Sequence, residues 1–133
     1  MPNDSVVESG IGMWHDKIQY FKSEIQPSQG GDEIQSEFFI SLADFPTAFQ
    51  ELYEATALFK EFVKVTEIRP IKASQVPLSP AYKRETMGIN FVWVNDFDTV
   101  MRGTEIVKVV LAKYNYRVHW GKYFGYLDRS YIE

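Results

Sequence analysis

Two kinds of hydrophobic spacing follow one another along the sequence, in an order that occurs twice. Stretches rich in β-branched and aromatic residues, typical of strands, run over 34–41, from 63 to about 70, over 86–94 and over 116–120. Between the first two and between the last two, apolar residues recur every three or four positions, which predicts a helix in each interval. The order strand–helix–strand, twice, predicts an α+β fold of the split βαβ–βαβ (ferredoxin-like) type. Such a fold has one antiparallel sheet with both helices on one face.

The two predicted helices have identifiable starts and apolar faces. Asp44 is a candidate N-cap with Pro46 in the turn that follows, and Asp96 or Asp98 can cap the second helix. The apolar faces comprise Phe45, Phe49, Leu52, Thr56, Phe59 and Val63 in the first helix, and Val100, Thr104, Val107 and Leu111 in the second. Both faces can cover the same side of the sheet, so the other side needs polar residues or another cover.

The length of 133 residues suits one domain, and we expect a single domain over 1–133. Within it, 12–33 form a lead-in segment and 34–122 form the sheet-and-helix core. Residues 27–32 of the lead-in are a predicted turn or loop, because the glycine pair there adopts positive φ at little cost.

Charge and composition make several classes of function improbable. The net charge is -4 with acids and bases interspersed, so we expect no nucleic-acid partner. No apolar run is long enough for a transmembrane segment. The lack of cysteine excludes disulfides and thiolate ligands, and it makes a cytoplasmic location the expectation. His15 and His119 are the only histidines and lie far apart, so we expect no metal site.

Strand alternation predicts a polar face on the sheet. Glu67 and Arg69 are two residues apart, so they project from the same face of the second strand. Asn90 and Val92 have the same relation in the third strand. A sheet face with paired charges is a plausible floor for a binding site whose roof lies elsewhere.

The segment Val118–Phe124, "VHWGKYF", brings titratable and aromatic groups close together near the end of the chain. If the last strand continues through it, Trp120 and Lys122 share one face, and His119 and Gly121 share the other. Lys122 could then join the polar residues of the second and third strands on one side of the sheet.

Each of these residues also has a structural interpretation. Glu67 and Arg69 could form a surface cross-strand charge network, which contributes little to stability. His119 could be a hydrogen-bonded structural histidine and Lys122 a solvated lysine. Asn90 could satisfy a hydrogen bond at a strand end.

Taken together and in order, five stretches resemble the C-terminal part of the alditol and xylitol oxidases. These enzymes belong with the aldonolactone oxidases, such as D-arabinono-1,4-lactone oxidase, among the vanillyl-alcohol-oxidase-type flavoproteins. The stretches are MWHDKIQYFK, GDEIQSEFFI, VTEIRPI, LSPAYKRETMGINFVW and VHWGKYF. They cover roughly 10–124, and the triplet 67–69 and the run 119–122 are the most specific.

In that family an FAD-binding domain precedes a C-terminal domain that caps the flavin and shapes the substrate pocket. The resemblance implies that this chain is the substrate-binding cap of an oxidoreductase that oxidises a sugar alcohol or an aldonolactone, with dioxygen as acceptor. FAD is the implied cofactor. The implied partner is the FAD-binding domain, which is missing from these 133 residues. We do not expect FAD to bind to this chain alone, which should be inactive by itself.

The resemblance also implies roles for residues. It places Glu67 and Arg69 at substrate hydroxyls, because a carboxylate accepts and a guanidinium donates hydrogen bonds. It places Lys122 next to the reacting hydroxyl and the flavin, as the catalytic residue. Lys122 or His119 could accept the hydroxyl proton or stabilise the developing charge. If His119 does not take part in proton transfer, it supports the pocket residues without contacting the substrate.

The remaining site positions include departures from the family pattern. Trp120 would shape the pocket wall, and Gly121 would permit close approach to the cofactor. Relatives usually have His-Phe-Thr-Trp where this chain has 90–93, so the substrate-binding positions Asn90 and Val92 lack an imidazole and a hydroxyl.

Two alternatives to the oxidase interpretation stay open from the sequence. One is a non-catalytic standalone α+β domain that binds a sugar-like ligand or a protein. The other is a homo-oligomer in which the exposed sheet faces cover one another.

Overall fold

The computed structural model describes residues 5–6, 10–13, 20–21 and 32–132, and the chain divides into two compact units. The first unit, Met1–Asp32, contains two short antiparallel strands, β1 (Ser5–Val6) and β2 (Tyr20–Phe21). The turn predicted at 27–32 lies, apart from Asp32, outside the described residues. The second unit, Glu33–Glu133, carries the remaining elements.

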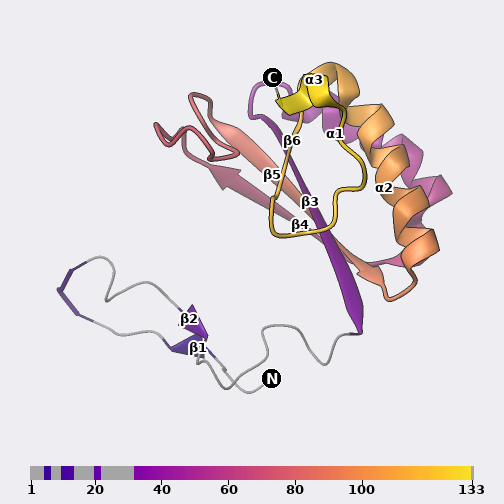
Figure 1. The fold of residues 1–133 in the computed structure, drawn as a ribbon, viewed down its shortest axis with the longest axis horizontal. Coiled ribbons are helices and arrows are strands. Elements are labelled where there is room, and N and C mark those ends of the chain that lie inside the picture. The colour runs from indigo at the N-terminus through magenta and orange to yellow at the C-terminus, as the bar shows by residue number, and fades with distance from the viewer. Residues whose placement is uncertain (1–4, 7–9, 14–19, 22–31, 133) are drawn as a thin grey trace. The chain divides into compact units, whose positions relative to one another are not determined.

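The second unit has a four-stranded antiparallel sheet with the order β4-β5-β3-β6. Its strands are β3 (Glu33–Ser41), β4 (Val63–Ile71), β5 (Thr86–Val94) and β6 (Arg117–Val118). Its helices are α1 (Phe45–Ala55), α2 (Phe97–Leu111) and the short α3 (Arg129–Ile132). Each helical crossover therefore joins two parallel strands with one antiparallel strand between them (Figure 1). The predicted α+β class and split βαβ–βαβ arrangement are confirmed.

The predicted strand boundaries hold for the first three strands and fail for the fourth. The first three differ from the prediction by one residue or less at each end. β6 contains only Arg117 and Val118, whereas the prediction extended the strand through Trp120. The chain turns directly after β6, because the backbone N–H of Lys122 donates to the carbonyl of His119 at 3.1 Å.

The helix starts are where the sequence predicts them. Asp96 caps α2, since its side chain accepts a hydrogen bond from the Thr99 backbone N–H at 2.9 Å, and this bond lowers the pKa of Asp96. Asp44 occupies the N-cap position of α1 with proline in the first turn, but its side chain makes no capping hydrogen bond. The prediction of a helix that runs on to Val63 is wrong. The helix ends at Ala55, where the Thr56 hydroxyl donates to the Tyr53 carbonyl at 2.6 Å, and short 3₁₀ turns follow.

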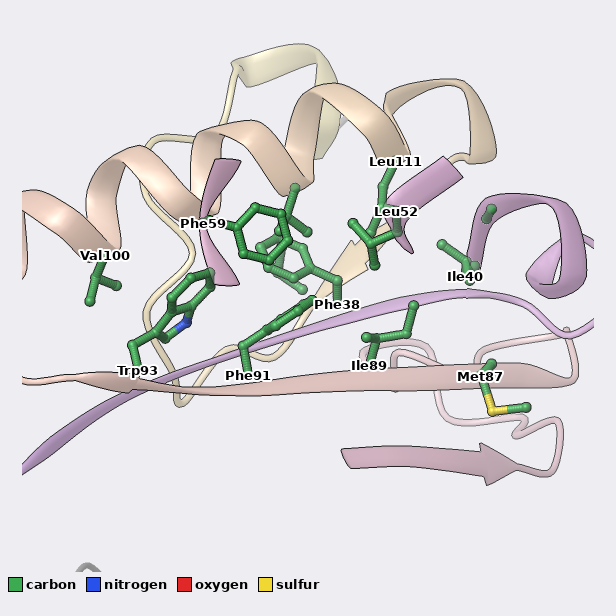
Figure 2. Close-up of a cluster of buried hydrophobic side chains, with 13 residues drawn as sticks. Phe38, Ile40, Leu52, Phe59, Met87, Ile89, Phe91, Trp93, Val100 and Leu111 are labelled. Atoms are coloured by element: carbon green, nitrogen blue, oxygen red, sulfur yellow. The ribbon is translucent and has the colours of Figure 1, made fainter. Parts of the chain in front are cut away.

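The core lies between the sheet and the two long helices (Figure 2). From the sheet it contains Phe38, Ile40, Met87, Ile89, Phe91, Trp93 and Val118, and from the helices Ala48, Leu52, Val100, Val107 and Leu111. Both helices thus cover the same face, as predicted. Helix α2 approaches the sheet closely at Gly103, where an added Cβ would lie 2.6 Å from a ring carbon of Trp93. The Trp93 indole N–H in turn donates to the Ser36 hydroxyl at 2.8 Å, so this buried polar group is satisfied.

The opposite face of the sheet is covered at one end by the connection between β4 and β5. Arg117 of β6 donates to the carbonyls of Pro80 and Tyr82, both at 2.9 Å, and Ala81 between them is buried. Arg84 donates to the carbonyl of Phe39 at 3.0 Å. The rest of this face carries the polar residues and the partly apolar strip described below. Among the described residues, no helix is both long and apolar enough to cross a membrane.

Candidate functional site

Three polar residues lie side by side on the sheet face that points away from the core. Asn90 of β5 pairs with Glu37 of β3 on one side and with Glu67 of β4 on the other. Directly opposed residues in antiparallel strands project from the same face, so the three side chains form a row across the sheet. The row is the floor of the candidate site.

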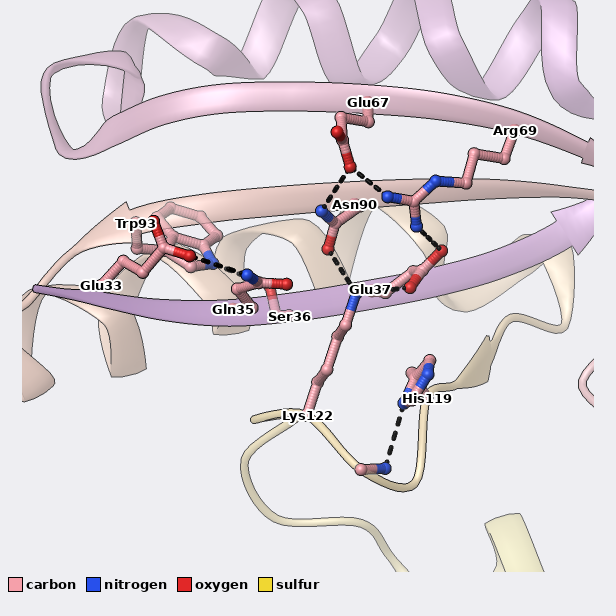
Figure 3. Close-up of polar contacts among 11 residues, drawn as sticks. Glu33, Gln35, Ser36, Glu37, Glu67, Arg69, Asn90, Trp93, His119 and Lys122 are labelled. Atoms are coloured by element: carbon pink, nitrogen blue, oxygen red, sulfur yellow. Dashed lines mark hydrogen bonds and ion pairs between the residues drawn. The ribbon is translucent and has the colours of Figure 1, made fainter. Parts of the chain in front are cut away.

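Two cations complete this row into a closed ring of contacts (Figure 3). Lys122 donates to Glu37 Oε2 at 2.7 Å and to Asn90 Oδ1 at 3.0 Å. Asn90 Nδ2 donates to Glu67 Oε2 at 3.0 Å. Arg69 donates through Nη2 to Glu67 and through Nη1 to Glu37 Oε1, the latter at 3.0 Å. We call these five residues the polar ring.

The polar ring has a buried side and an accessible side. Glu37 and Asn90 are 4% and 1% exposed, whereas the side chains of Glu67 and Arg69 are 47% and 46% exposed. Lys122 is intermediate at 18%. A ligand on this face would therefore meet Glu67, Arg69 and Lys122 first, and the two buried members would hold those three in place.

A tight turn, and not a strand, carries Lys122 into the polar ring. The turn is attached to β3 at both ends, because the His119 N–H donates to the Glu37 carbonyl at 3.0 Å and the Tyr123 N–H to the Gln35 carbonyl at 2.9 Å. Inside the turn, the Gly121 N–H donates to His119 Nδ1 at 3.0 Å. The predicted strand alternation of 119–122 is therefore wrong, although Lys122 still reaches the expected side of the sheet.

The other residues singled out from this segment lie around the polar ring, not in it. The His119 ring stacks on Phe39 with their centroids 6.3 Å apart. Trp120 is 54% exposed and meets Phe124 edge to face. Gly121 is exposed, and a Cβ there would lie 3.2 Å from a ring carbon of His119.

Val92 occupies the next row of the same face. It pairs with Gln35 on β3 and with Val65 on β4, and Val65 is 50% exposed. The polar ring thus adjoins a partly apolar strip. Of the four positions expected to contact substrate, the structure brings Glu67, Arg69 and Asn90 into the ring and leaves Val92 beside it.

The sequence reasoning missed Glu37, which contacts both cations of the polar ring. Alternation along the first strand contains the signal. Ser36, Phe38 and Ile40 are buried in the core or against it, so Glu37 must project from the opposite face. In the split βαβ topology the first strand also neighbours the third, which places Glu37 beside Asn90.

The chemistry of the polar ring suits a ligand with several hydroxyl groups. A hydroxyl donates and accepts, and it can match both an exposed carboxylate and a guanidinium. Among the described residues, no group of three or more His, Cys, Asp or Glu side chains could hold a metal ion. A concavity of about 350 Å³ lies away from the polar ring, between α1 and β4, but its lining is mainly apolar or aromatic, including Phe49, Phe59 and Phe91.

Comparison with known proteins shows which family the chain belongs to. The family model of D-arabinono-1,4-lactone oxidase matches residues 7–130. The alditol oxidase of Streptomyces sp. (strain IKD472 / FERM P-14339) is 28% identical over 113 residues. That match covers 85% of this chain and 27% of the relative, so the chain spans about a quarter of the relative's length. Since the family model covers most of its residues, the chain belongs to the D-arabinono-1,4-lactone oxidase family.

Proposed function

We propose that residues 33–132 form the substrate-binding part of an oxidoreductase that acts on a sugar alcohol or an aldonolactone. Family membership supports the oxidoreductase class. The polar ring is the observation that carries the proposal, because it presents acceptors and donors side by side on an open face. The remaining parts of the enzyme would lie against this face.

Binding would use the accessible members of the polar ring. Glu67 accepts hydrogen bonds from substrate hydroxyls, and Arg69 donates to their oxygens in a planar fork that fixes orientation. Asn90 is already hydrogen-bonded on both sides of its amide, so it holds Glu67 and Lys122 in place for the substrate. Val92, beside the ring, would contact substrate carbons.

Lys122 is the proposed catalytic residue. Oxidation of a hydroxyl-bearing carbon would remove a hydride from the carbon and release the hydroxyl proton to water, so negative charge would develop on the hydroxyl oxygen as that proton leaves. A cation placed at that oxygen stabilises the charge. Trp120 and Gly121 of the same turn would border the pocket, and His119 would support the turn from the Phe39 side.

The described residues do not fit the pyrophosphate of FAD, the cofactor on which this family depends in general. A dinucleotide pyrophosphate is commonly held by a glycine-rich loop at a helix N-terminus. Here Asp44 and Asp96 occupy the N-cap positions of α1 and α2, without a glycine-rich loop, and both carboxylates oppose an anion at those ends. We therefore propose that a separate flavin-binding domain holds FAD, with dioxygen as the final acceptor, and that this domain packs on the polar-ring face.

Titration of the chain with xylitol and with D-arabinono-1,4-lactone, followed by amide NMR, tests the binding proposal. We expect shifts confined to the polar ring and its neighbours, and about a tenfold or greater loss of affinity in Arg69→Met, because a hydrogen bond to a charged group is removed. Lys113→Met, which removes an exposed lysine paired with Glu51, is the matched control and should bind like the unaltered chain. Absence of ring shifts with either compound at tens of millimolar would overturn the proposal.

Self-association remains the second candidate role for the same face. The observation in its favour is Val65, which lies on this face in the edge strand β4 and is 50% exposed. Sedimentation of the purified chain decides this point, because a monomer at micromolar concentrations would exclude it and a dimer disrupted by Val65→Glu would support it.

A further inference from the structure

We infer that Glu37 is the positioning residue of the polar ring, which fixes the Lys122 amine and the Arg69 guanidinium where a substrate hydroxyl would meet them. The inference rests on the proposed function for its catalytic meaning. Its structural part, that Glu37 holds Lys122, stands on the contacts alone.

The first observation is that the Glu37 carboxylate is buried and that each of its two oxygens has a cationic partner. Glu37 is 4% exposed, and each of its oxygens contacts a different cation: Oε1 Arg69 at 3.0 Å and Oε2 Lys122 at 2.7 Å. A buried carboxylate is costly unless it is paired, so the two cations and Glu37 depend on one another. Glu37 thus sets the separation and orientation of the two cations that a substrate would meet.

The second observation concerns the hydrogens of Lys122. Its amine donates to the Glu37 carboxylate and to the Asn90 carbonyl oxygen, both of which are acceptors. With two hydrogens directed at these acceptors, the third hydrogen of the amine can donate to a substrate oxygen. Lys122 is thereby placed to stabilise negative charge on that oxygen.

The third observation concerns the turn that carries Lys122. Its Gly121 N–H donates to His119 Nδ1 at 3.0 Å. This hydrogen bond shapes the turn, so the turn and Glu37 together fix where the Lys122 amine lies.

Glu37 lies two strands away from Arg69, and the intervening strand makes room for their contact. Arg69 pairs with Gly88 of β5, which has no side chain between the two. A Cβ on Gly88 would lie 3.1 Å from Glu37 Oε1 and 3.1 Å from a ring carbon of Phe39. The open backbone at Gly88 is what lets the Arg69 guanidinium pass over β5.

The experiment measures the Nζ–H NMR signal of Lys122 in the chain labelled with ¹³C and ¹⁵N. We expect a resolved ammonium signal with a scalar coupling across the hydrogen bond to the Glu37 carboxyl carbon. In Glu37→Gln, which keeps the size and removes the charge, the signal should be lost to rapid exchange. Glu105→Gln is the matched control, since Glu105 pairs with Lys108 at 2.5 Å on α2 and should leave the Lys122 signal unchanged.

The same variants are titrated with xylitol. We expect Glu37→Gln to weaken binding about tenfold or more, as for the loss of a charged hydrogen-bond partner, with Glu105→Gln unaffected. A Lys122 signal that persists in Glu37→Gln, or unaltered xylitol affinity in a folded Glu37→Gln chain, overturns the inference. If Glu37→Gln does not fold, the coupling in the unaltered chain decides: its absence overturns the inference and its presence supports it. If xylitol does not bind to the unaltered chain, the binding proposal fails, while the Lys122 signal still decides whether Glu37 holds the amine.

Discussion

Arg69 and Glu37 form an ion pair at 3.0 Å although their strands are not neighbours, because Gly88 of the strand between them carries no side chain. Adjacent strands are about 4.8 Å apart, so the two side chains together bridge close to twice that distance. A short polar network across three strands therefore depends on one residue that takes no part in it.

Gly88→Val is expected to weaken ligand binding without changing any charge. The added methyl groups would meet Glu37 Oε1 and the Phe39 ring, which displaces Arg69 from Glu37. Xylitol affinity measured by amide NMR should fall severalfold, and Gly88→Ala should have a smaller effect. An Arg69–Glu37 contact that survives in Gly88→Val, seen in its crystal structure, would contradict this explanation.

Lys122→Met and Glu37→Gln are expected to be non-additive in the free energy of unfolding. Removal of the amine alone leaves a buried oxygen of Glu37 without its partner, which costs about 1–3 kcal/mol. The double variant removes both charges and should lose less than the sum of the single variants, by about 0.5–3 kcal/mol. Urea unfolding of the unaltered chain, the two single variants and the double variant gives the four free energies of unfolding. Strict additivity of the two losses would mean that the two groups do not interact.

Gly103→Ala should lower the stability of the fold. A Cβ at this position would lie 2.6 and 2.9 Å from two ring carbons of Trp93, which is held by its hydrogen bond to Ser36. Overpacking of this kind costs about 1–3 kcal/mol, and the better helix propensity of alanine returns about 1 kcal/mol of it. Val109→Ala on the exposed face of α2 is the control and should change stability by less than about 0.5 kcal/mol. A higher melting temperature for Gly103→Ala would contradict the close approach of α2 to the sheet.

Tyr131 makes stability depend on pH in the alkaline range. Burial raises the pKa of Tyr131 to about 12, against about 10 in the unfolded chain. A raised pKa in the folded state contributes stability that is fully present below about pH 10 and is lost as the pH rises through about 12. Denaturant unfolding between about pH 8 and 12 should show this loss, reduced in Tyr131→Phe and unchanged in Tyr53→Phe, whose tyrosine is exposed. If the free energy of unfolding falls equally with pH in all three chains, Tyr131 is not the source of the pH dependence.

The sequence predicts the sheet and its topology because the stretches with a strand-like or helix-like hydrophobic pattern are long and unambiguous. Each of the first three strands has nine residues, enough for alternation to be read, and α2 places all four predicted face residues in buried positions. The end of α1 was not predictable in the same way. Phe59 remains buried after the helix stops, so its apolar spacing imitates another helical turn.

The site was predictable where two residues share a strand and not where a turn sets the geometry. Glu67, Arg69 and Asn90 follow from alternation, and Glu37 would follow from the same rule applied to the first strand together with the strand order. The position of Lys122 depends on the hydrogen bond from Gly121 to the His119 side chain, a local contact that no periodicity reveals.

The polar ring contains two acids and two bases, so its formal charge is zero. Such a group exerts little long-range attraction, and an uncharged guest reaches it at the ordinary diffusive rate for unsteered encounters. Its affinity should hardly vary with ionic strength, because mobile ions screen distant exposed charges far more than contacts within a partly buried network. If the proposed function holds, the site would recognise a polyhydroxylated molecule through short-range contacts and would give no long-range advantage to a charged one.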